Sequence, residues 1–561
     1  MMSSTFKLFL FCFVVLFTEK VFFWLYLWQL KNYHLKRLMA HLTTHQGKHL
    51  LLNLQNIILA SSILWLALIT LLKEKDAFTT FYVFGLFILN LALAGLTLKA
   101  LVSFILLKSK RPVLTKKSGL LILTILLLGT IFTLIFLPFQ ENAILAFLVI
   151  LFLEPIIISA VVLALEPLTV YKRKQILEKA KVKRANLPDL KVIAITGSYG
   201  KTSVKEYIYQ ILKEKFGEEA VVKTEKHINA EIGIAQIILN KINKKTKVFI
   251  VEVGAYEKGK IKEVCKMVKP DIAVLTGINN QHLSTFGSQE NIVQAKFEVI
   301  EGLNNQGVGV YNLDSPLITN KKKLITNNKI KTITCSAKQE ADIMAADIMT
   351  QKETISFKAF SKTGGSAQFN LRALGKQTVE NVLLAVAVAQ ELTIPLKKSA
   401  DVLAENNLGQ EATKLVKQGL CDVLLTDYSA NLTGVLADLE YLKLWSGKKI
   451  IIMPCLIELG KTAKETHFQI GEKISKVCNL AIITSCDYFK ELKQGALKNN
   501  PSFEDKIIYL QNPKQITKKI NAILSLSKDA SSKKDNVDNV VLIEGRVNKA
   551  VILAIENYQK S

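Results

Sequence analysis

The feature that most constrains the fold of this chain is a series of long, unbroken apolar runs before about residue 168. They lie near residues 5–30, 51–72, 79–107, 119–138 and 143–165. Each is about as long as the roughly 20 residues that an α-helix needs to cross a bilayer. No small-residue cleavage site follows the first run, which is typical of an anchor rather than of a removed signal peptide. We therefore expect a multi-pass α-helical membrane region over residues 1–170, with about five transmembrane helices and the lipid bilayer as a partner.

The loops between these runs predict an orientation. Residues 31–50 and 108–118 are rich in Lys and Arg, whereas the loops Lys73–Ala77 and Phe139–Asn142 have no basic excess. Basic loops stay on the cytoplasmic side of a membrane. The pattern predicts a cell-membrane protein with its N-terminus outside and everything after Lys172 in the cytoplasm.

Two features of this region allow more than one interpretation. Glu154 falls near the middle of the fifth run, where a carboxylate is costly and often functional. We favour the simpler interpretation of a kinked helix whose glutamate faces the bundle, because Pro155 follows it. His41, His45 and His49 have a spacing that would stack them on one helix face, as in a metal site, but we favour a solvated juxtamembrane helix.

After about residue 168, short apolar runs alternate with polar, lysine-rich stretches, the pattern of an α/β protein. The net charge of +26 suits an anionic partner such as a lipid surface or nucleotide phosphates, and a generally lysine-rich proteome explains it equally well. No basic stripe is interleaved with aromatic residues, so we do not expect nucleic acid as a partner. The seven scattered cysteines form no C-x-x-C pair, which argues against a disulfide framework and a zinc ribbon.

The strongest chemical signal is a phosphate-binding loop. A short β-branched segment, Lys191–Thr196, runs into a glycine turn and then into a helical pattern that continues through Leu212. In this setting backbone N–H groups bind phosphates, a lysine reaches the terminal phosphates, and a hydroxyl ligates Mg²⁺. The general pattern G-x-x-x-x-G-K-[ST] is not met, because Ile195 replaces its first glycine, but the shorter T-G-x-x-G-K-T-[ST] is. The predicted loop residues are Gly197, Ser198, Tyr199, Gly200, Lys201, Thr202 and Ser203.

This short loop resembles that of the Mur ligases of bacterial cell-wall synthesis, and further segments follow in the family's order. Asn229–Gly233 (N-A-E-I-G) and Phe249–Ala255 (F-I-V-E-V-G-A) are similar to segments of the D-alanyl-D-alanine-adding branch. Ala295–Glu298 (A-K-F-E) resembles the family's A-K-x-E. Tyr311–Asp314 and Gly375–Asn381 resemble N-x-D and G-x-H-N-x-x-N, and they include Asn312, Asp314 and Asn381. Gly277 and Gln377 depart from the family, which has Asn and His there.

The resemblance implies roles for these positions. Lys201, Lys296 and His282 would be catalytic, and Asn312, Asp314 and Asn381 would join the phosphate loop in binding ATP. Thr202 and Glu252 would hold one Mg²⁺ and His282 the second. Lys296 matches a lysine that is carbamylated in the family, which turns a cation into an anion that helps to bind Mg²⁺.

The last third of the chain resembles the family's C-terminal domain. Val423–Asn431 is similar to D-x-Y-N-A-N. Ile450–Gly460, followed by His467, is similar to G-D-M-x-E-L-G…H, with Pro454 and Cys455 at its start instead of Gly and Asp. Val541–Arg546 stands where the family has V-L-x-K-G-S-R. The resemblance implies a Rossmann-like domain that closes over ATP and brings in the amine.

We therefore expect a membrane region at 1–170, a linker at 171–189, a central ATP-binding domain at 190–407 and a C-terminal domain at 408–561. The function implied is an ATP-dependent ligase that forms an amide bond through an acyl phosphate. It would add D-alanyl-D-alanine, or a similar amine, to a peptidoglycan precursor peptide at the membrane. Apolar runs occupy the place of the family's UDP-binding domain. Either the enzyme holds a nucleotide-linked precursor differently, or its precursor is already lipid-linked, or it acts on another carboxylate.

Two other functions stay open. The first is a catalytically weakened scaffold for cell-wall enzymes, for which Gly277, Gln377 and Pro454 argue. The second is an ATPase that drives transport through the five spans, against which the short form of the phosphate loop and the lack of internal repeats argue.

Overall fold

The computed structural model describes residues 4–71, 78–106, 108–225, 228–304, 306–321, 330–406, 414–418, 421–426, 431–525 and 538–558. The chain divides into two compact units, Met1–Lys174 and Gln175–Ser561. Each unit has its own buried apolar core, and no described core cluster contains residues of both.

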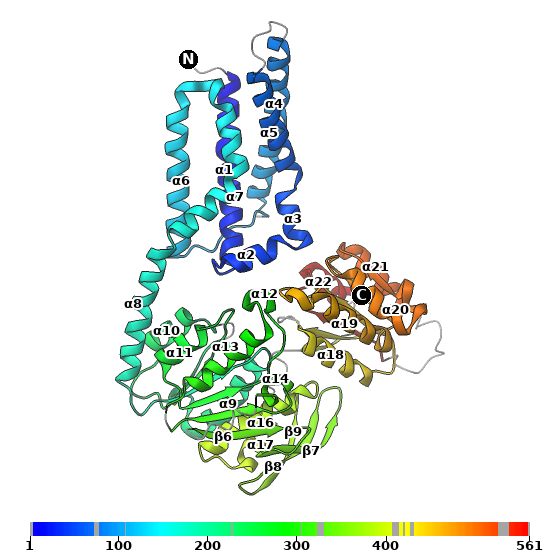
Figure 1. Ribbon diagram of the computed structural model, residues 1–561. Coiled ribbons are helices and arrows are strands. Elements are labelled where there is room, and N and C mark those ends of the chain that lie inside the picture. Colours follow the sequence, from blue (N-terminus) through cyan, green and yellow to red (C-terminus); the bar gives the residue numbers. More distant parts are fainter. Residues whose placement is uncertain are drawn as a thin grey trace. The chain divides into compact units, whose positions relative to one another are not determined.

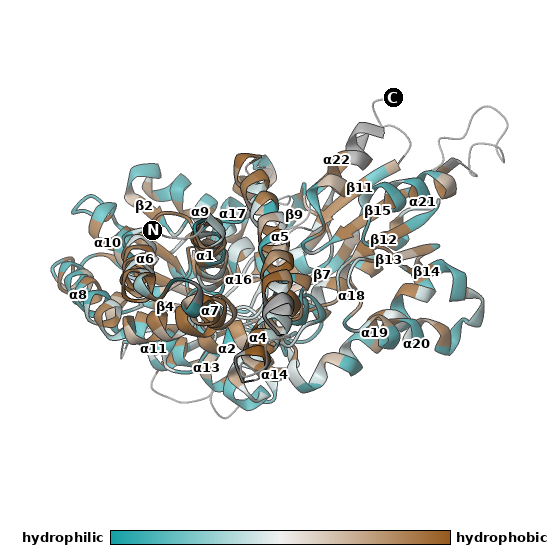
Figure 2. Cartoon of the chain, turned by 90° about the horizontal axis from the view of Figure 1, so that it is seen from above, coloured by the Kyte–Doolittle hydropathy of each residue, from teal (hydrophilic) through white to brown (hydrophobic). Residues whose placement is uncertain are grey.

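The first unit is a bundle of apolar helices: α1 (Ser4–Leu30), α4 (Leu54–Leu71), α5 (Phe78–Ile105), α6 (Lys116–Phe136) and α7 (Ile144–Ala164) (Figure 1). The described residues contain five helices long and apolar enough to cross a membrane. Their positions agree with the predicted runs to within a few residues. Large apolar side chains are also exposed on these helices, among them Leu64 on α4 and Phe84 and Phe87 on α5. The mostly brown colour of α4 and α5 in Figure 2 marks their apolar composition. Such helices are typical of a lipid-facing bundle.

The predicted stacking of three histidines on one helix is wrong. The segment forms two short helices, α2 (Leu35–Leu42) and α3 (His45–Leu51), with a break between His41 and His45. Thr44 caps α3, because its hydroxyl accepts a hydrogen bond from the N–H of Gly47 at 3.1 Å. A threonine cap at this point starts a new helix instead of continuing the first. Only His45 and His49 share a helix, with ring centroids 4.5 Å apart.

Buried polar groups join three helices of the bundle around Pro155 in α7. Proline has no N–H, so the carbonyl of Leu151 one turn earlier loses its helical donor. The ammonium of Lys20 in α1 donates to that carbonyl at 2.8 Å and to Asn56 Oδ1 in α4 at 3.2 Å. Glu154 lies next to this junction, fully buried, and faces the bundle as the simpler interpretation predicts.

A long helix, α8 (Glu166–Ala185), runs through the predicted linker and contains the boundary between the two units. Its last turn is fixed to the second unit by Arg184. The guanidinium donates to the carbonyls of Val268, Leu187 and Leu190 at 2.7–3.0 Å. The segment predicted as a linker is therefore helical as far as Ala185.

The second unit begins with a nine-stranded mixed sheet in the order β2-β3-β1-β4-β5-β6-β7-β8-β9. Neighbours from β2 to β7 are parallel, and β7, β8 and β9 are antiparallel. The helices α9 (Lys201–Phe216) and α16 (Gln377–Glu391) cover one face, and α10 (Glu231–Asn240), α11 (Lys260–Val268) and α13 (Gln289–Glu301) cover the other. The strands are β1 (Lys191–Thr196), β2 (Val221–Lys223), β3 (Val248–Glu252), β4 (Ile272–Leu275), β5 (Val308–Asn312), β6 (Lys331–Ser336), β7 (Ile343–Thr350), β8 (Ile355–Ser361) and β9 (Ser366–Leu371).

The register of the central strands positions the site. Ile195 of β1 lies opposite Glu252 of β3, and Thr196 lies opposite Leu275 of β4. The segments that follow these strands therefore leave the sheet at the same edge. In open parallel sheets this carboxyl edge is where ligands bind.

A second sheet follows, in the order β10-β11-β15-β12-β13-β14. All its neighbours are parallel except β10 and β11. The helices α18 (Leu432–Tyr441), α19 (Ala463–Val477) and α20 (Phe489–Asn499) cover one face, and α21 (Pro513–Ser525) and α22 (Lys549–Tyr558) cover the other (Figure 1). The strands are β10 (Lys414–Gln418), β11 (Cys421–Thr426), β12 (Lys449–Met453), β13 (Leu480–Ile483), β14 (Ile507–Tyr509) and β15 (Val540–Glu544). The second unit is thus α/β, with two sheets covered on both faces.

Candidate active site

The predicted phosphate loop lies between β1 and α9. Gly200 has a φ of +80°, and a Cβ there would lie 2.5 Å from Asn381 Oδ1, so both the backbone conformation and the space require glycine. Asn381 comes from α16, so this helix reaches the loop as predicted. The ammonium of Lys201 donates to the carbonyl of Gly197 at 2.8 Å, and Thr202 and Ser203 lie in the first turn of α9. A glycine turn at a helix N-terminus is suited to bind phosphates.

Glu252, at the end of β3, faces the start of α9. Its Oε2 accepts a hydrogen bond from the Thr202 hydroxyl at 2.9 Å, and its Oε1 accepts one from Asn229 at 3.3 Å. The fully buried Lys205, one turn after Lys201, lies 3.6 Å from Oε2. The hydroxyl and carboxylate predicted to share one Mg²⁺ are thus in contact, and hard oxygen atoms are the ligands that Mg²⁺ prefers.

Lys296 lies on α13 and is only 4% exposed. Burial, with the positive charge of Lys201 as the second cause, lowers the pKa of Lys296 to about 7. Burial also lowers the pKa of Lys201, while the charge of Glu252 opposes the shift. Lys201 is thus close enough to interact electrostatically with both Lys296 and Glu252. A lysine with this pKa is largely neutral at pH 8, and its amine is then a nucleophile.

His282 precedes α12 (Leu283–Phe286) and completes the cluster. Burial lowers its pKa, a hydrogen bond to Glu458 acts in the opposite direction, and the charges of Lys296 and Lys201 lower it further. The ring of Tyr256 packs edge-on against the imidazole, with centroids 4.7 Å apart. Residues from four different segments, Lys201, Glu252, His282 and Lys296, therefore lie in one electrostatic neighbourhood.

Asn312 and Asp314, which are predicted to contact the nucleotide, form hydrogen bonds between the ends of neighbouring strands. Asn312 donates to the carbonyl of Thr276 at 2.7 Å and to Glu380 at 3.1 Å. The carboxylate of Asp314 accepts bonds from Ser336 and from the N–H of Ala337 at 2.5 and 2.6 Å. Both residues lie at the carboxyl edge of the sheet, where they join β5 to β4 and β6. Their contact with a nucleotide stays a prediction.

Gly277 and Gln377, the two positions of the central domain that depart from the family pattern, each lie against another residue. A Cβ at Gly277 would lie 2.3 Å from the ring of Tyr199, so the tyrosine of the phosphate loop takes the space of the side chain that this position lacks. Gln377 donates to the carbonyl of Thr433 at 3.2 Å. Neither substitution leaves a defect in the packing at these positions.

Sequence reasoning missed several residues that shape the site. Asn279 donates to Asn431 at 2.8 Å and to Thr433 at 3.3 Å, and Glu458 reaches His282. These contacts join the central sheet's loops to the C-terminal domain. Glu298, the last residue of the A-K-F-E segment, accepts bonds from the N–H groups of Gly259 and Lys262 and so caps α11. The quoted motifs contain several of these residues, but no local pattern identifies their partners.

His467 and Glu544, which belong to the C-terminal motifs, contact residues of their own domain. His467 is fully buried: its Nδ1–H donates to the carbonyl of Ala463 at 2.6 Å, and its Nε2 accepts from the N–H of Leu456 at 2.9 Å. The carboxyl groups of Asp438 on α18 and Glu544 at the end of β15 are close enough to interact, with Glu544 where the family has Lys. Residues 427–430 of the D-x-Y-N-A-N-like segment lie outside the described residues.

The described residues contain no group of three or more His, Cys, Asp or Glu side chains able to hold a metal alone. The predicted Mg²⁺ ligands do not form such a group, because Thr202 would contribute a hydroxyl and Lys296 a carbamylated amine. Mg²⁺ usually keeps waters and binds through one or two carboxylates together with substrate phosphates. The residues present therefore fit Mg²⁺ bound together with a nucleotide.

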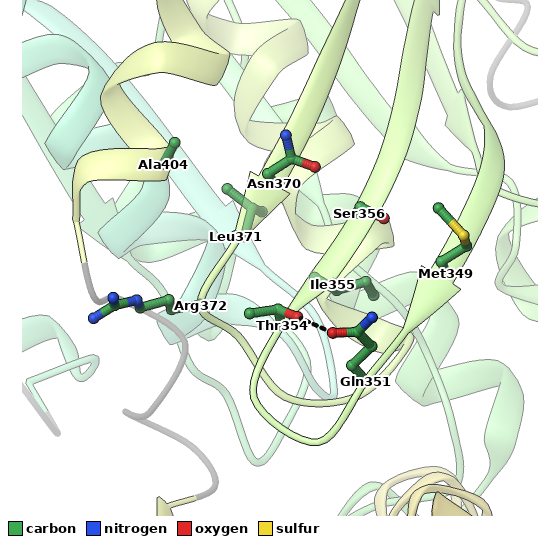
Figure 3. A pocket seen from close by; sticks show the side chains of 9 residues that line it. All are labelled: Met349, Gln351, Thr354, Ile355, Ser356, Asn370, Leu371, Arg372 and Ala404. Carbon is green, nitrogen blue, oxygen red and sulfur yellow. Dashed lines mark hydrogen bonds between the residues drawn. The ribbon is translucent and has the colours of Figure 1, made fainter.

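A pocket of about 390 Å³ lies at the ends of β7, β8 and β9 (Figure 3). Its residues are none of those predicted for the site, and the hydroxyl of Thr354 donates to Gln351 within it at 3.0 Å. It is lined by Met349, Gln351, Thr354, Ile355, Ser356, Asn370, Leu371, Arg372 and Ala404.

Comparison with known proteins agrees with this geometry. Residues 195–389 match the Mur ligase middle domain. A UDP-N-acetylmuramoyl-tripeptide–D-alanyl-D-alanine ligase of Buchnera aphidicola is 31% identical over 59% of this chain and 71% of its own length. The protein of the same name from Haemophilus influenzae is 30% identical over 54% of this chain and 64% of its own length.

Solved structures show the same fold. A crystal structure of MurF from Acinetobacter baumannii has a TM-score of 0.61 at 20% identity and covers 69% of this chain and 81% of its own. The Thermotoga maritima MurF ligase in complex with ADP has a TM-score of 0.58 at 22% identity, over 69% of this chain and 84% of its own. With the phosphate loop, Glu252, His282 and Lys296 gathered at one sheet edge, these likenesses lead to one conclusion: the chain belongs to the Mur ligase family.

Proposed function

We propose that this protein is an ATP-dependent ligase that adds D-alanyl-D-alanine to the peptide of UDP-N-acetylmuramoyl-tripeptide, with ATP and Mg²⁺ as cofactors. The curated relatives carry the name of this activity. The observation that carries the proposal is the cluster of Lys201, Glu252, His282 and Lys296 at the phosphate loop. A carboxylate joined to an amine through an acyl phosphate requires such a combination of phosphate-binding and metal-binding groups.

Each residue of the cluster has a proposed role. Lys201 and the loop from Gly197 to Gly200 bind the phosphates, and Asn381 lies beside the same loop. Thr202 and Glu252 would hold one Mg²⁺, and His282 with carbamylated Lys296 the second. The bound ions would neutralise charge on the γ-phosphate and on the acyl phosphate. The low pKa of Lys296 supports this role, because only the neutral amine reacts with CO₂.

The membrane placement is part of the proposal. The five apolar helices would anchor the protein in a bacterial cell membrane, with the N-terminus outside and the second unit in the cytoplasm, where ATP is available. The precursor would then be used at the membrane surface, either linked to UDP or already linked to lipid. The parallel strands of the second sheet support a Rossmann-like classification of the C-terminal domain.

One experiment tests the function and its alternatives. The detergent-solubilised protein is incubated with ATP, Mg²⁺, UDP-linked tripeptide precursor and D-alanyl-D-alanine, and phosphate release and product mass are measured. We expect phosphate release that requires the amine. The product should be heavier than the precursor by the mass of D-alanyl-D-alanine less one water. Release without the amine would indicate a transport-type ATPase, and no release with any substrate would indicate a scaffold.

A further inference from the structure

Glu458 connects the C-terminal domain to the predicted metal ligand His282. It lies in the segment between β12 and α19, and its Oε2 is 2.5 Å from His282 Nδ1. Its side chain is 8% exposed. A buried carboxylate this close to an imidazole N–H forms a charge-assisted hydrogen bond, which is among the stronger polar contacts in proteins.

The backbone around this contact is held in an unusual conformation. Glu458 and His282 have φ values of +64° and +63°, in the left-handed region that residues other than glycine rarely adopt. The N–H of Ser284 donates to the carbonyl of Glu458 at 3.2 Å, next to the side-chain contact. Figure 1 shows α12 beside the start of α19, where these two segments meet. Strained residues of this kind persist only where the surrounding contacts fix them, and they cluster at functional sites.

The contact determines which imidazole nitrogen is free. Because Nδ1 faces a carboxylate, it carries the proton and donates it, which leaves the lone pair of Nε2 available to a ligand. The edge-on ring of Tyr256 limits the rotation of the imidazole. Histidines that bind metals usually donate their other N–H to a carboxylate or a carbonyl, and this partner sets the ring's orientation.

We propose that Glu458 is a positioning residue that fixes His282 as a metal ligand, so that tight metal binding requires the C-terminal domain to be in contact with the central sheet. The inference rests on the proposed function for the identity of the ion, Mg²⁺ bound with a nucleotide. The carboxylate also offsets the positive charge that Lys201 and Lys296 place near His282, which would otherwise disfavour a cation there. Other contacts between the domains, such as Asn279 with Asn431 and Gln377 with Thr433, lie outside this pair and would persist without Glu458.

The test measures metal binding rather than turnover. The full chain is titrated with Mn²⁺ in the presence of ADP, and free Mn²⁺ is followed by electron paramagnetic resonance. We expect Glu458→Ala to weaken the His282-dependent ion by about 10- to 100-fold, the usual effect of losing such a partner. Glu458→Gln, which keeps a hydrogen-bond acceptor without its charge, should lose less. Glu465→Gln is the matched control, because Glu465 is an exposed residue of the same domain.

A double-mutant cycle of Glu458→Ala and His282→Ala shows whether Glu458 acts on the metal through His282 or only contributes a structural contact. If Glu458 acts through His282, the double variant Glu458→Ala/His282→Ala should bind Mn²⁺ no more weakly than His282→Ala alone. Unchanged binding in Glu458→Ala, or fully additive losses in the double variant, would overturn the inference. Absence of ligation with normal Mn²⁺ and ADP binding would refute the proposed function but not this inference.

Discussion

At the scale of single residues, the site depends on how burial changes lysine chemistry. Lys201 and Lys296 are both desolvated and lie in each other's field, so neither is an ordinary surface cation. Lys201 stays close to the loop carbonyls, whereas Lys296, with its pKa lowered to about 7, is partly neutral near neutral pH. Two residues of one type thus have different chemistry because of their surroundings.

Lys201→Ala should abolish ATP turnover and leave the fold intact. Its ammonium donates to the carbonyl of Gly197 in the loop, so its loss removes a charge and one local hydrogen bond. Phosphate release and thermal unfolding are measured side by side. Normal turnover in this variant would refute the phosphate-loop assignment.

Lys296→Ala should be nearly inactive, yet regain activity when a small carboxylate such as acetate is supplied at high concentration. The carboxylate would replace the carbamate anion near Mg²⁺. Lys296→Arg keeps a positive charge and cannot be carbamylated, so it should stay inactive under the same conditions. An arginine variant with full activity would refute the carbamate.

Carbamate formation on Lys296 should also depend on pH, because it requires the neutral amine. The amine is mostly protonated at pH 6 and mostly neutral at pH 8, because its pKa is about 7 instead of 10.5. At limiting CO₂, the carbamate signal from ¹³C-labelled bicarbonate in NMR should therefore increase from pH 6 to pH 8. A signal that is absent throughout this range would contradict it.

At the scale of elements, two buried polar contacts join secondary structures. One is the carboxyl pair of Asp438 on α18 and Glu544 on β15, and the other is the Lys20 junction between α1, α4 and α7. Each makes a specific contribution to stability, because buried polar groups are costly unless they are paired.

Glu544→Gln should stabilise the C-terminal domain above pH 6. Burial raises the pKa of Asp438 to about 6, and burial with the charge of Asp438 raises that of Glu544 well above its usual range. Both carboxyls are therefore more stable protonated when folded, and this stabilisation is complete below about pH 4 and lost as the pH rises through 6. We expect a gain on the order of 1–3 kcal/mol at pH 8 and none at pH 4. Thermal unfolding followed by Trp445, the sole tryptophan of the second unit, measures it, with Glu465→Gln as the control.

Lys20→Met should destabilise the bundle by about 1–3 kcal/mol, because the Leu151 carbonyl then has no donor. Adding Pro155→Ala restores an N–H to α7, so Lys20→Met/Pro155→Ala should be more stable than Lys20→Met alone. Unfolding in mixed detergent micelles is followed by the fluorescence of the buried Trp24 and Trp28. Strictly additive effects of the two changes would show that Lys20 does not replace the missing helical donor.

At the scale of the whole molecule, the two units have separate cores, and the described core clusters share no residues. Separate cores predict separate folding. The apolar helices of the first unit and the sheets of the second should then be separable in solution.

A fragment that begins at Glu166, where α8 starts, should fold and bind Mg²⁺–ADP with an affinity within about threefold of the full chain. It should fail to sediment with liposomes, whereas the full chain does. Sedimentation and calorimetric titration measure both properties. An aggregated fragment, or one that does not bind the nucleotide, would show that the first unit is needed for the fold of the second.

Local patterns in the sequence determined the apolar helices, the conformation of the phosphate loop and the family of this protein. The apolar runs predicted the five helices to within a few residues, because helix length and apolarity are local properties. The T-G-x-x-G-K-T-S run predicted a strand, a turn and a helix, and the structure has all three at Thr196–Ser203. The resemblance of short motifs was enough to predict the family. The histidine stack was wrong, because a single threonine cap ended the helix.

Only the tertiary structure decided which residues meet. His282 and Glu458 are 176 positions apart, and Lys20 and Leu151 are 131 apart, so no periodicity links them. The ring of Tyr199 over Gly277 and the contact between Lys205 and Glu252 likewise depend on neighbouring strands in the sheet. A local pattern specifies the conformation of its own segment, whereas a contact between distant segments depends on the register of the sheet and the packing of the domains.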